Sequence, residues 1–347
     1  MPPSLIVRED SSLTGFTDKA IMKQIIVFSI ILFAVCLTAV PCFSDDKLHA
    51  YSFEKADKVS LFIGESTWQS TGDNEWNIAG TRSGGPPNIL SELEYLGVES
   101  TVVEIYGGIR EGRGALTVAY GFGSMSGGIY RDSDYLRDNR QGIYSLSTGS
   151  ADGNDWNALY YWNIEYTYRL ITNMPEERFN ELYLDLLIGY QKWREEITMT
   201  NGYQETGGTL GPFSGLNSKY EFIWKSIRIG LEGGLPAYKG FSFMGSAIFI
   251  PYTEYEGKGI WNLRTDFKQN PSFTHDAKGG YGLQAEAAIA YYLYPAMDIK
   301  AGYRYWYIKS GDGDDVTYFS DGSVGITQLN EAVSERQGFF LDIRYIF

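Results

Sequence analysis

The last nine residues of the chain alternate between two kinds of side chain. Phe339, Leu341, Ile343, Tyr345 and Phe347 share one face of an extended strand, and Phe340, Asp342, Arg344 and Ile346 share the other. An apolar, aromatic face opposite one that carries Asp342 and Arg344 is typical of a lipid-facing barrel strand. A half-buried strand of a soluble β-sandwich would alternate in the same way, so these residues alone do not decide the fold class.

The same alternation recurs in nine earlier segments between turn signals. With the closing strand, the segments are 58–69, 88–109, 114–126, 156–171, 180–200, 218–234, 241–258, 278–294, 298–310 and 335–347. Their number is even, as a closed bacterial barrel with both ends on one side requires. The sequence therefore predicts an all-β fold, a single closed antiparallel transmembrane β-barrel of about ten strands.

The connections between these segments alternate in length. The even-numbered segments are followed by short turns, at 110–113, 172–178, 235–240 and 294–297. The odd-numbered segments are followed by long polar stretches such as 126–155. Short periplasmic turns and long extracellular loops are typical of outer-membrane barrels. Inner-face charges such as Glu286 and Arg304 predict a narrow lumen that is filled by paired side chains and does not conduct large solutes.

The N-terminal end of the chain predicts export. Met22 and Lys23 precede an apolar run at 25–40, which small residues and two aspartates follow, and this is the pattern of a secretory signal peptide. We expect residues 22–44 to be that signal peptide, residues 1–21 to be an extension from a mis-called start, and residues 45–347 to be the barrel. Both cysteines lie in the expected signal peptide, so we expect an exported protein without disulfides or a thiol nucleophile.

Composition narrows the function classes. Aromatic residues make up 16% of the chain, with 27 Tyr, 8 Trp and 40 Gly, which suits a large sheet with aromatic girdles and many turns. The mean hydropathy is −0.23, so we expect no membrane-spanning helix in the exported part. The formal charge of −14 disfavours nucleic acid as a partner and suits basic ligands. Two histidines cannot supply a usual zinc site, so we expect no metal.

Five short segments carry a resemblance to a known family. They are Ser91–Tyr95, Arg131–Tyr135, Ile188–Gln191, Ile229–Leu231 and Tyr292–Ala296. In order and spacing they resemble the omptins, ten-stranded outer-membrane endopeptidases, over about residues 60–347, although no single match is specific. The resemblance implies a hydrolase that cleaves exposed peptides near basic residues. It also implies lipopolysaccharide as an activating lipid partner and no other cofactor.

The resemblance implies a water held between two aspartates and a second Asp/His pair across the barrel mouth. The Asp-x-Asp of the family falls on Asp132 and Asp134, and this spacing puts both carboxylates on one face of a strand, where close like charges raise a pKa. If the alternation of the segment 116–122 continued unchanged along the strand, the side chains of Asp132 and Asp134 would point outward. A one-residue bulge around Gly127 and Gly128 would turn them to the lumen. The alternative interpretation is that Asp132 and Asp134 lie in a solvated acidic loop.

The second pair is where the chain departs from the omptin pattern. Omptins place Asp-x-His near the outer end of the seventh strand, where residues 254–264 contain neither Asp nor His. Because His49 lies far toward the N-terminus, His275 is the sole candidate base, with the adjacent Asp276 as its partner. Neighbouring residues in a strand face opposite sides, so Asp276 orients His275 only if the backbone turns there. The alternative is an exposed loop histidine.

The resemblance also places a substrate-binding residue. Glu75 falls near the acidic residue that receives a basic substrate side chain in the omptins, and an acidic loop can accept Arg or Lys through charge-assisted hydrogen bonds. By sequence, Asp73 and Glu65 are equally well placed.

A lipid site is expected at the outer rim. Tyr190, Lys192 and Arg194 continue the lipid-facing side of their strand, and two cations beside a tyrosine can bind lipopolysaccharide phosphates. Omptins carry Tyr-x-Glu-x-Arg there, so Lys192 replaces the glutamate. The alternative is ordinary girdle residues whose charged ends reach the interface.

These features predict an omptin-like endopeptidase of the bacterial outer membrane whose catalytic set is incomplete. The final Phe347 resembles the terminal signal that the barrel assembly machinery recognises. The alternative function is a non-catalytic barrel with a binding or structural role. A small pore or hydrophobic-ligand transporter fits ten strands but does not fit the charged and aromatic inner face.

Overall fold

The computed structural model describes residues 59–153, 155–173, 181–294 and 296–347. The expected extension at 1–21, the expected signal peptide at 22–44 and His49 lie outside the described residues, so these expectations stay predictions. Within the described part of the chain, no helix is long and apolar enough to cross a membrane.

The described residues form fourteen strands in one antiparallel sheet. The strands are β1 (Ser60–Ile78), β2 (Ser91–Glu111), β3 (Gly114–Arg137), β4 (Gln141–Gly153), β5 (Leu159–Thr172), β6 (Tyr183–Thr206), β7 (Gly211–Pro212), β8 (Ser218–Pro236), β9 (Phe241–Ile260), β10 (Phe273–Lys278), β11 (Gly280–Tyr294), β12 (Met297–Ser310), β13 (Gly313–Tyr318) and β14 (Val324–Ile346).

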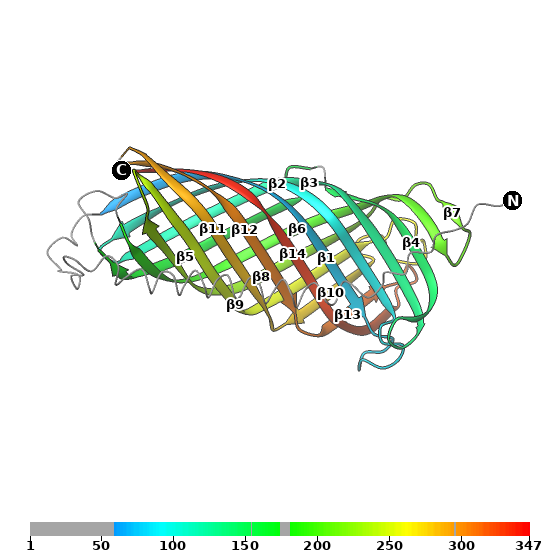
Figure 1. Cartoon of the computed structure of the whole chain (residues 1–347). Helices are drawn as coiled ribbons and strands as arrows, with labels where there is room; N and C mark the ends of the chain where they lie inside the picture. The colour runs from blue at the N-terminus through cyan, green and yellow to red at the C-terminus, as the bar shows by residue number, and fades with distance from the viewer. Residues whose placement is uncertain (1–58, 154, 174–180, 295) are drawn as a thin grey trace. The chain divides into compact units, whose positions relative to one another are not determined.

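Ten of these strands close a ring. Each pairs with the next in the order β1, β2, β3, β5, β6, β8, β9, β11, β12 and β14, and β14 pairs back to β1 (Figure 1). The predicted all-β, closed antiparallel barrel of about ten strands is therefore confirmed.

The long polar connections differ from the expectation, because much of their length is strand. The stretch 126–155 contains the outer half of β3 and all of β4, which pairs with β3 and β6 beyond the end of β5. In the same way, β10 and β13 pair with each other beyond β11 and β12. Strands beyond the lipid no longer need apolar outer faces, so their sequence resembles that of a loop.

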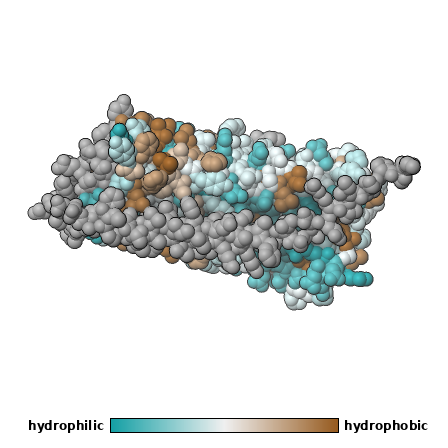
Figure 2. All heavy atoms as spheres, in the orientation of Figure 1, coloured by the Kyte–Doolittle hydropathy of each residue, from teal (hydrophilic) through white to brown (hydrophobic). Residues whose placement is uncertain are grey.

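Alternation along each strand separates a lipid-facing side from a packed interior. On β14, Leu341 and Ile343 are 52% and 41% exposed, whereas Arg336 and Asp342 are buried. Hydrophobic residues gather toward the end of the barrel that carries the C-terminus, and the visible surface is more polar beyond them (Figure 2). This arrangement is the apolar belt expected for a barrel in lipid.

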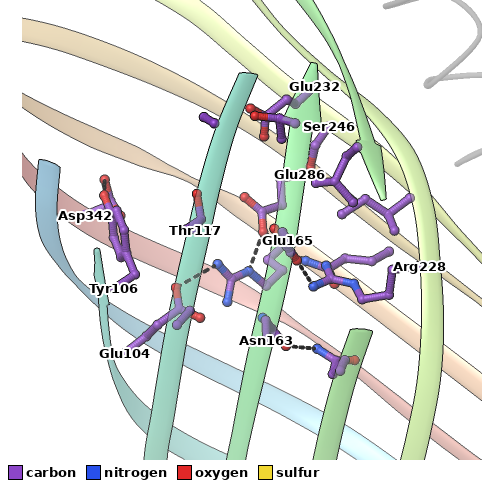
Figure 3. A pocket seen from close by; sticks show the side chains of 18 of the residues that line it. Glu104, Tyr106, Thr117, Asn163, Glu165, Arg228, Glu232, Ser246, Glu286 and Asp342 are labelled. Atoms are coloured by element: carbon purple, nitrogen blue, oxygen red, sulfur yellow. Dashed lines mark hydrogen bonds and ion pairs between the residues drawn. The ribbon is translucent and has the colours of Figure 1, made fainter. Parts of the chain in front are cut away.

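The interior of the barrel is filled, as the sequence predicts. The ring of Trp193 stacks on those of Trp306 and Tyr161, with centroids 4.5 and 4.7 Å apart. These three rings line part of a cavity of about 230 Å³. There, Arg304 forms ion pairs with Glu104 at 3.7 Å and Glu286 at 2.6 Å (Figure 3). Paired charges of this kind offset the cost of burying each one alone.

Candidate functional site

Asp132 and Asp134 lie on the outer half of β3 and face the lumen. The pairing register of β3 with β4 shifts between Met125 and Gly128, and Gly127 has a φ of +73°. Glycine tolerates this left-handed conformation. The extra residue reverses which side chains point inward, so Asp132 is on the same face as its buried cross-strand partner Leu93. The bulge that the sequence required is present, and the aspartates do not lie in a solvated loop.

The two aspartates are half-buried and close enough to affect one another. Burial, and then the charge of Asp134, raise the pKa of Asp132. Burial also raises the pKa of Asp134, against a hydrogen bond with Ser91 and the charge of Arg264. Two carboxyl groups whose environment favours the protonated form are typical of sites that use carboxyl groups in proton transfer.

His275 lies in β10 with its side chain fully buried. Its Nε2 lies 3.1 Å from Oδ1 of Asp315, and its Nδ1 lies 2.6 Å from the hydroxyl of Tyr220. Because a carboxylate only accepts, Nε2 carries the proton, and Nδ1 accepts the hydrogen bond from Tyr220. The other oxygen of Asp315 accepts from Thr327 at 2.7 Å. These contacts form a buried Asp–His pair.

The expectation that Asp276 is the partner of His275 is wrong. It follows His275 in a regular strand, where neighbouring side chains face opposite sides, and Asp276 is exposed. The actual partner, Asp315, lies opposite His275 on β13. The alternative of an exposed loop histidine is wrong as well. Asp315 was missed because it is distant from His275 in sequence, and only the register of β10 with β13 joins them.

Aromatic side chains fill the space between the aspartates and the Asp–His pair. Going round the rim, β3 and β10 are separated by four strands on either side. The hydroxyls of Tyr220 and Tyr255 lie 2.6 Å apart. Burial, then Asp132, and then Tyr255 raise the pKa of Tyr95, so this phenol lies near groups from both sides. Tyr95, Tyr255 and Tyr220 therefore form a row of phenols between the two aspartates of β3 and the Asp–His pair.

Several buried polar groups in the mouth have no hydrogen-bond partner among the described residues. They are both amide atoms of Asn74, the indole N–H of Trp76 and the hydroxyl of Tyr95. Trp76 also packs edge-on against His275, with ring centroids 4.8 Å apart. A buried polar group without a partner costs free energy, and such groups often mark a functional site. Among the described residues, no group of three or more His, Cys, Asp or Glu side chains could hold a metal ion.

Glu75 does not lie with these residues. It pairs in register with Glu94 on β2, and the residues on either side of it in β1, Asn74 and Trp76, are the buried ones. Glu75 therefore faces the outer side of the wall and has no part in the site around Asp132. Of the two other acidic residues considered, Asp73 accepts a hydrogen bond from the backbone N–H of Gly97 at 2.6 Å.

The surroundings of Glu75 give a testable pH dependence. Burial, and then the charges of Glu331, Glu92 and Glu94, raise the pKa of Glu75 from 4.5 to about 7. Between pH 4.5 and about 7, Glu75 is more protonated in the folded protein than in the unfolded chain. The contribution of Glu75 to the free energy of unfolding therefore falls as the pH rises. Glu75→Gln is therefore expected to stabilise the barrel at pH 7.5, on the order of 1 kcal/mol after solvent screening. Urea unfolding in lipid vesicles at pH 4.5 and 7.5 measures this, and a variant with the same pH dependence as the wild type would contradict it.

The expected lipid-binding residues lie on the outer face of β6. Tyr190 is 37% exposed. Arg194 forms ion pairs with Glu221 and Glu196, so much of its charge is already neutralised. Lys192 has no ion pair among the described residues, and it lies directly opposite Lys225 on β8. Lys225 forms an ion pair with Glu256 on β9, so Lys192 is the cation at this rim that lacks a counter-charge among the described residues.

Comparisons with known proteins agree with this architecture. A model of the family described as "Pom: Protochlamydia outer membrane protein" matches residues 67–347. A search of curated proteins found no match. The crystal structure of the outer membrane protease OmpT from Escherichia coli is similar, with a TM-score of 0.68 and 15% identity, covering 87% of this chain and 100% of that one.

Two other solved barrels are more distant. The translocator domain of the autotransporter NalP from Neisseria meningitidis gives a TM-score of 0.34 at 8% identity, covering 93% of this chain and 97% of that one. A Pseudomonas aeruginosa FadL homologue gives a TM-score of 0.29 at 11% identity, and the match covers 82% of this chain and 90% of that one. At such identities, the similarity to OmpT shows a shared fold and does not show membership of the omptins.

Proposed function

The chain belongs to the Protochlamydia outer membrane protein family and is a β-barrel of the outer membrane, and from this premise we propose that it is an omptin-like surface endopeptidase. One observation carries the proposal. Asp132 and Asp134 face the lumen on one side of the mouth, and a His–Asp pair, His275 with Asp315, lies in the wall across from them. The omptin resemblance implies two such pairs, and the second is built here from two different strands.

In the proposed reaction, Asp132 and Asp134 hold a water molecule beside the substrate carbonyl. The water oxygen bonds to the carbonyl carbon, and a water proton passes to the hydroxyl of Tyr220 while that hydroxyl gives its own proton to Nδ1 of His275. The same relay returns the proton to the amine nitrogen as the C–N bond breaks. Asp315 stabilises the positive imidazolium formed between these steps.

A basic substrate is supported by charge. The chain carries a formal charge of −14, and acidic surfaces attract basic ligands.

A second candidate function is a non-catalytic barrel with a binding or structural role. The observation that favours it is the environment of His275, whose side chain is fully buried and whose two ring nitrogens both have protein partners. In that case, the Asp315–His275–Tyr220 chain is a satisfied core network that fixes the mouth.

Peptide cleavage separates the two candidates. Refolded protein is mixed with lipopolysaccharide and a quenched peptide that contains Arg-Arg, with the same peptide containing Gln-Gln as the control. The proposal predicts turnover of the first peptide, and a rate that falls in Tyr220→Phe, which keeps the ring but removes the relay hydroxyl. No turnover of either peptide by folded protein would favour the non-catalytic barrel.

We also propose that lipopolysaccharide phosphates bind at Lys192 and Lys225. Lys192 has no counter-charge among the described residues, and Lys225 opposite it is paired with the partly exposed Glu256, so a phosphate beside Lys192 supplies the missing counter-charge. Trp162 lies opposite Lys192 on β5, so an aromatic ring borders the same patch, where the apolar belt ends. The lipid contact would therefore use the strand pair β6 and β8.

Charge reversal tests the lipid site. Lys192→Glu and Lys225→Glu are each expected to weaken lipopolysaccharide binding about fivefold, since each lysine near an anionic surface contributes about 1 kcal/mol. Binding to vesicles with and without lipopolysaccharide measures this. The matched control is Lys239→Glu, in the turn before β9 at the opposite end of the barrel. Equal binding by all three variants would exclude the site.

A further inference from the structure

A carboxylate lies on the lipid-facing side of the barrel. Glu65 is exposed on the outer face of β1. Its cross-strand neighbours are Ile343 on β14 and Ile105 on β2, and Ile63 lies two residues away on the same face. These three isoleucines are 41%, 50% and 50% exposed, as side chains in the apolar belt are. Glu65 therefore lies inside the belt.

Further polar side chains extend from Glu65 along the same face. Thr67 and Gln69 follow it on β1, and Thr101 on β2 lies opposite Gln69. We call Glu65, Thr67, Gln69 and Thr101 the β1 polar stripe. None of the four side chains makes a hydrogen bond to another described residue. On the other side of Gln69 is Phe339, which is 74% exposed, so the stripe interrupts an otherwise apolar surface.

Such a stripe is unfavourable against lipid alone. Charged residues on the lipid face of a barrel destabilise it, and polar groups in hydrocarbon have no water to bind. Membrane proteins satisfy such groups with polar groups of a neighbouring protein in the bilayer. The side chains of the β1 polar stripe therefore need a partner at the same depth.

We propose that this partner is a second copy of the chain, bound through the β1 polar stripe. In a two-fold dimer with its axis along the membrane normal, the same surface of each copy meets the other at equal depth. The stripe is suited to pairing with itself. Glu65 offers acceptors, the threonine hydroxyls donate and accept, and the Gln69 amide does both. Thr67 and Thr101 are small, so the two walls can approach closely.

Disulfide cross-linking tests the dimer. Cys36 and Cys42 are the only cysteines of the chain, and both are first replaced by Ser. Thr67→Cys then places one thiol within the stripe, and Ile188→Cys, at a site 51% exposed on the outer face of β6, is the matched control. Both proteins are refolded into phospholipid vesicles, checked for folding by heat-modifiable gel mobility and oxidised. The yield of covalent dimer is measured on non-reducing gels.

The dimer predicts that Thr67→Cys cross-links at least about tenfold more than Ile188→Cys. Adding Glu65→Leu should lower the Thr67→Cys yield by about tenfold, which corresponds to about 1.4 kcal/mol of association free energy. Equal cross-linking at the two sites would overturn the proposal, and so would a yield that Glu65→Leu does not change. Cross-linking of Thr67→Cys in native membranes to a different protein, without homodimer, would overturn it as well.

Discussion

Asp134→Asn is expected to lower the rate of peptide cleavage by a factor of about 10²–10⁴ while leaving the barrel folded. The amide keeps the shape of the side chain, but it has no negative charge to hold the water and to balance the positive charge that develops on the water as it attacks. Asp132→Asn should have an effect of similar size, because the two carboxyl groups lie together on one face and act on one water. The value of kcat/KM for the quenched peptide measures both.

The control for this prediction is a carboxylate just outside the lumen. Glu94→Gln removes a carboxylate from the outer face of β2, where Glu94 lies opposite Arg131, and should leave cleavage unchanged. A loss of less than about tenfold in both aspartate variants would show that these carboxyl groups take no part in the reaction.

Arg336→Met is expected to lower the free energy of unfolding by about 3–5 kcal/mol. Arg336 and Glu195 form an ion pair inside the barrel, and both side chains are fully buried. Nη1 of Arg336 also donates to the carbonyl of Val98 at 3.0 Å. Removing the guanidinium leaves the carboxylate of Glu195 buried without its counter-charge, and that cost dominates the change.

Unfolding by urea in lipid vesicles, followed by tryptophan fluorescence, measures the effect. Arg82→Met is the control, because the ion pair of Arg82 with Asp314 is about half exposed and such pairs contribute at most about 1 kcal/mol. Adding Glu195→Gln to Arg336→Met should recover part of the loss. Equal stability losses for Arg336→Met and Arg82→Met would contradict this explanation.

The barrel could be predicted from sequence because lipid imposes a simple rule. A strand in the belt needs apolar side chains outside and tolerates charges inside, so residues such as Ile343 and Asp342 reveal its orientation without any knowledge of its partners. Beyond the lipid the rule no longer holds. The outer half of β3 and all of β4 therefore resembled a loop, although backbone pairing continues through them.

The site was only half predictable, for a similar reason. The Asp-x-Asp spacing of Asp132 and Asp134 is local, and the bulge that turns them inward falls at glycines. The pairing of His275 with Asp315 depends on the register between β10 and β13, which no local pattern specifies. The strand pleat also sends Glu75 to the outer wall, away from the substrate-binding position that the omptin resemblance implied for it.

The central claim is that the His275–Asp315 pair serves the reaction at the mouth, and its most direct test compares two aspartates. Asp315→Asn removes the charge that orients and stabilises His275, whereas Asp276→Asn changes an exposed carboxylate of the same strand pair. Cleavage of the Arg-Arg peptide by each refolded variant is measured with lipopolysaccharide. The account predicts a loss of at least about 100-fold for Asp315→Asn and a change within about twofold for Asp276→Asn. Full activity of Asp315→Asn, or an equal loss in Asp276→Asn, would contradict it.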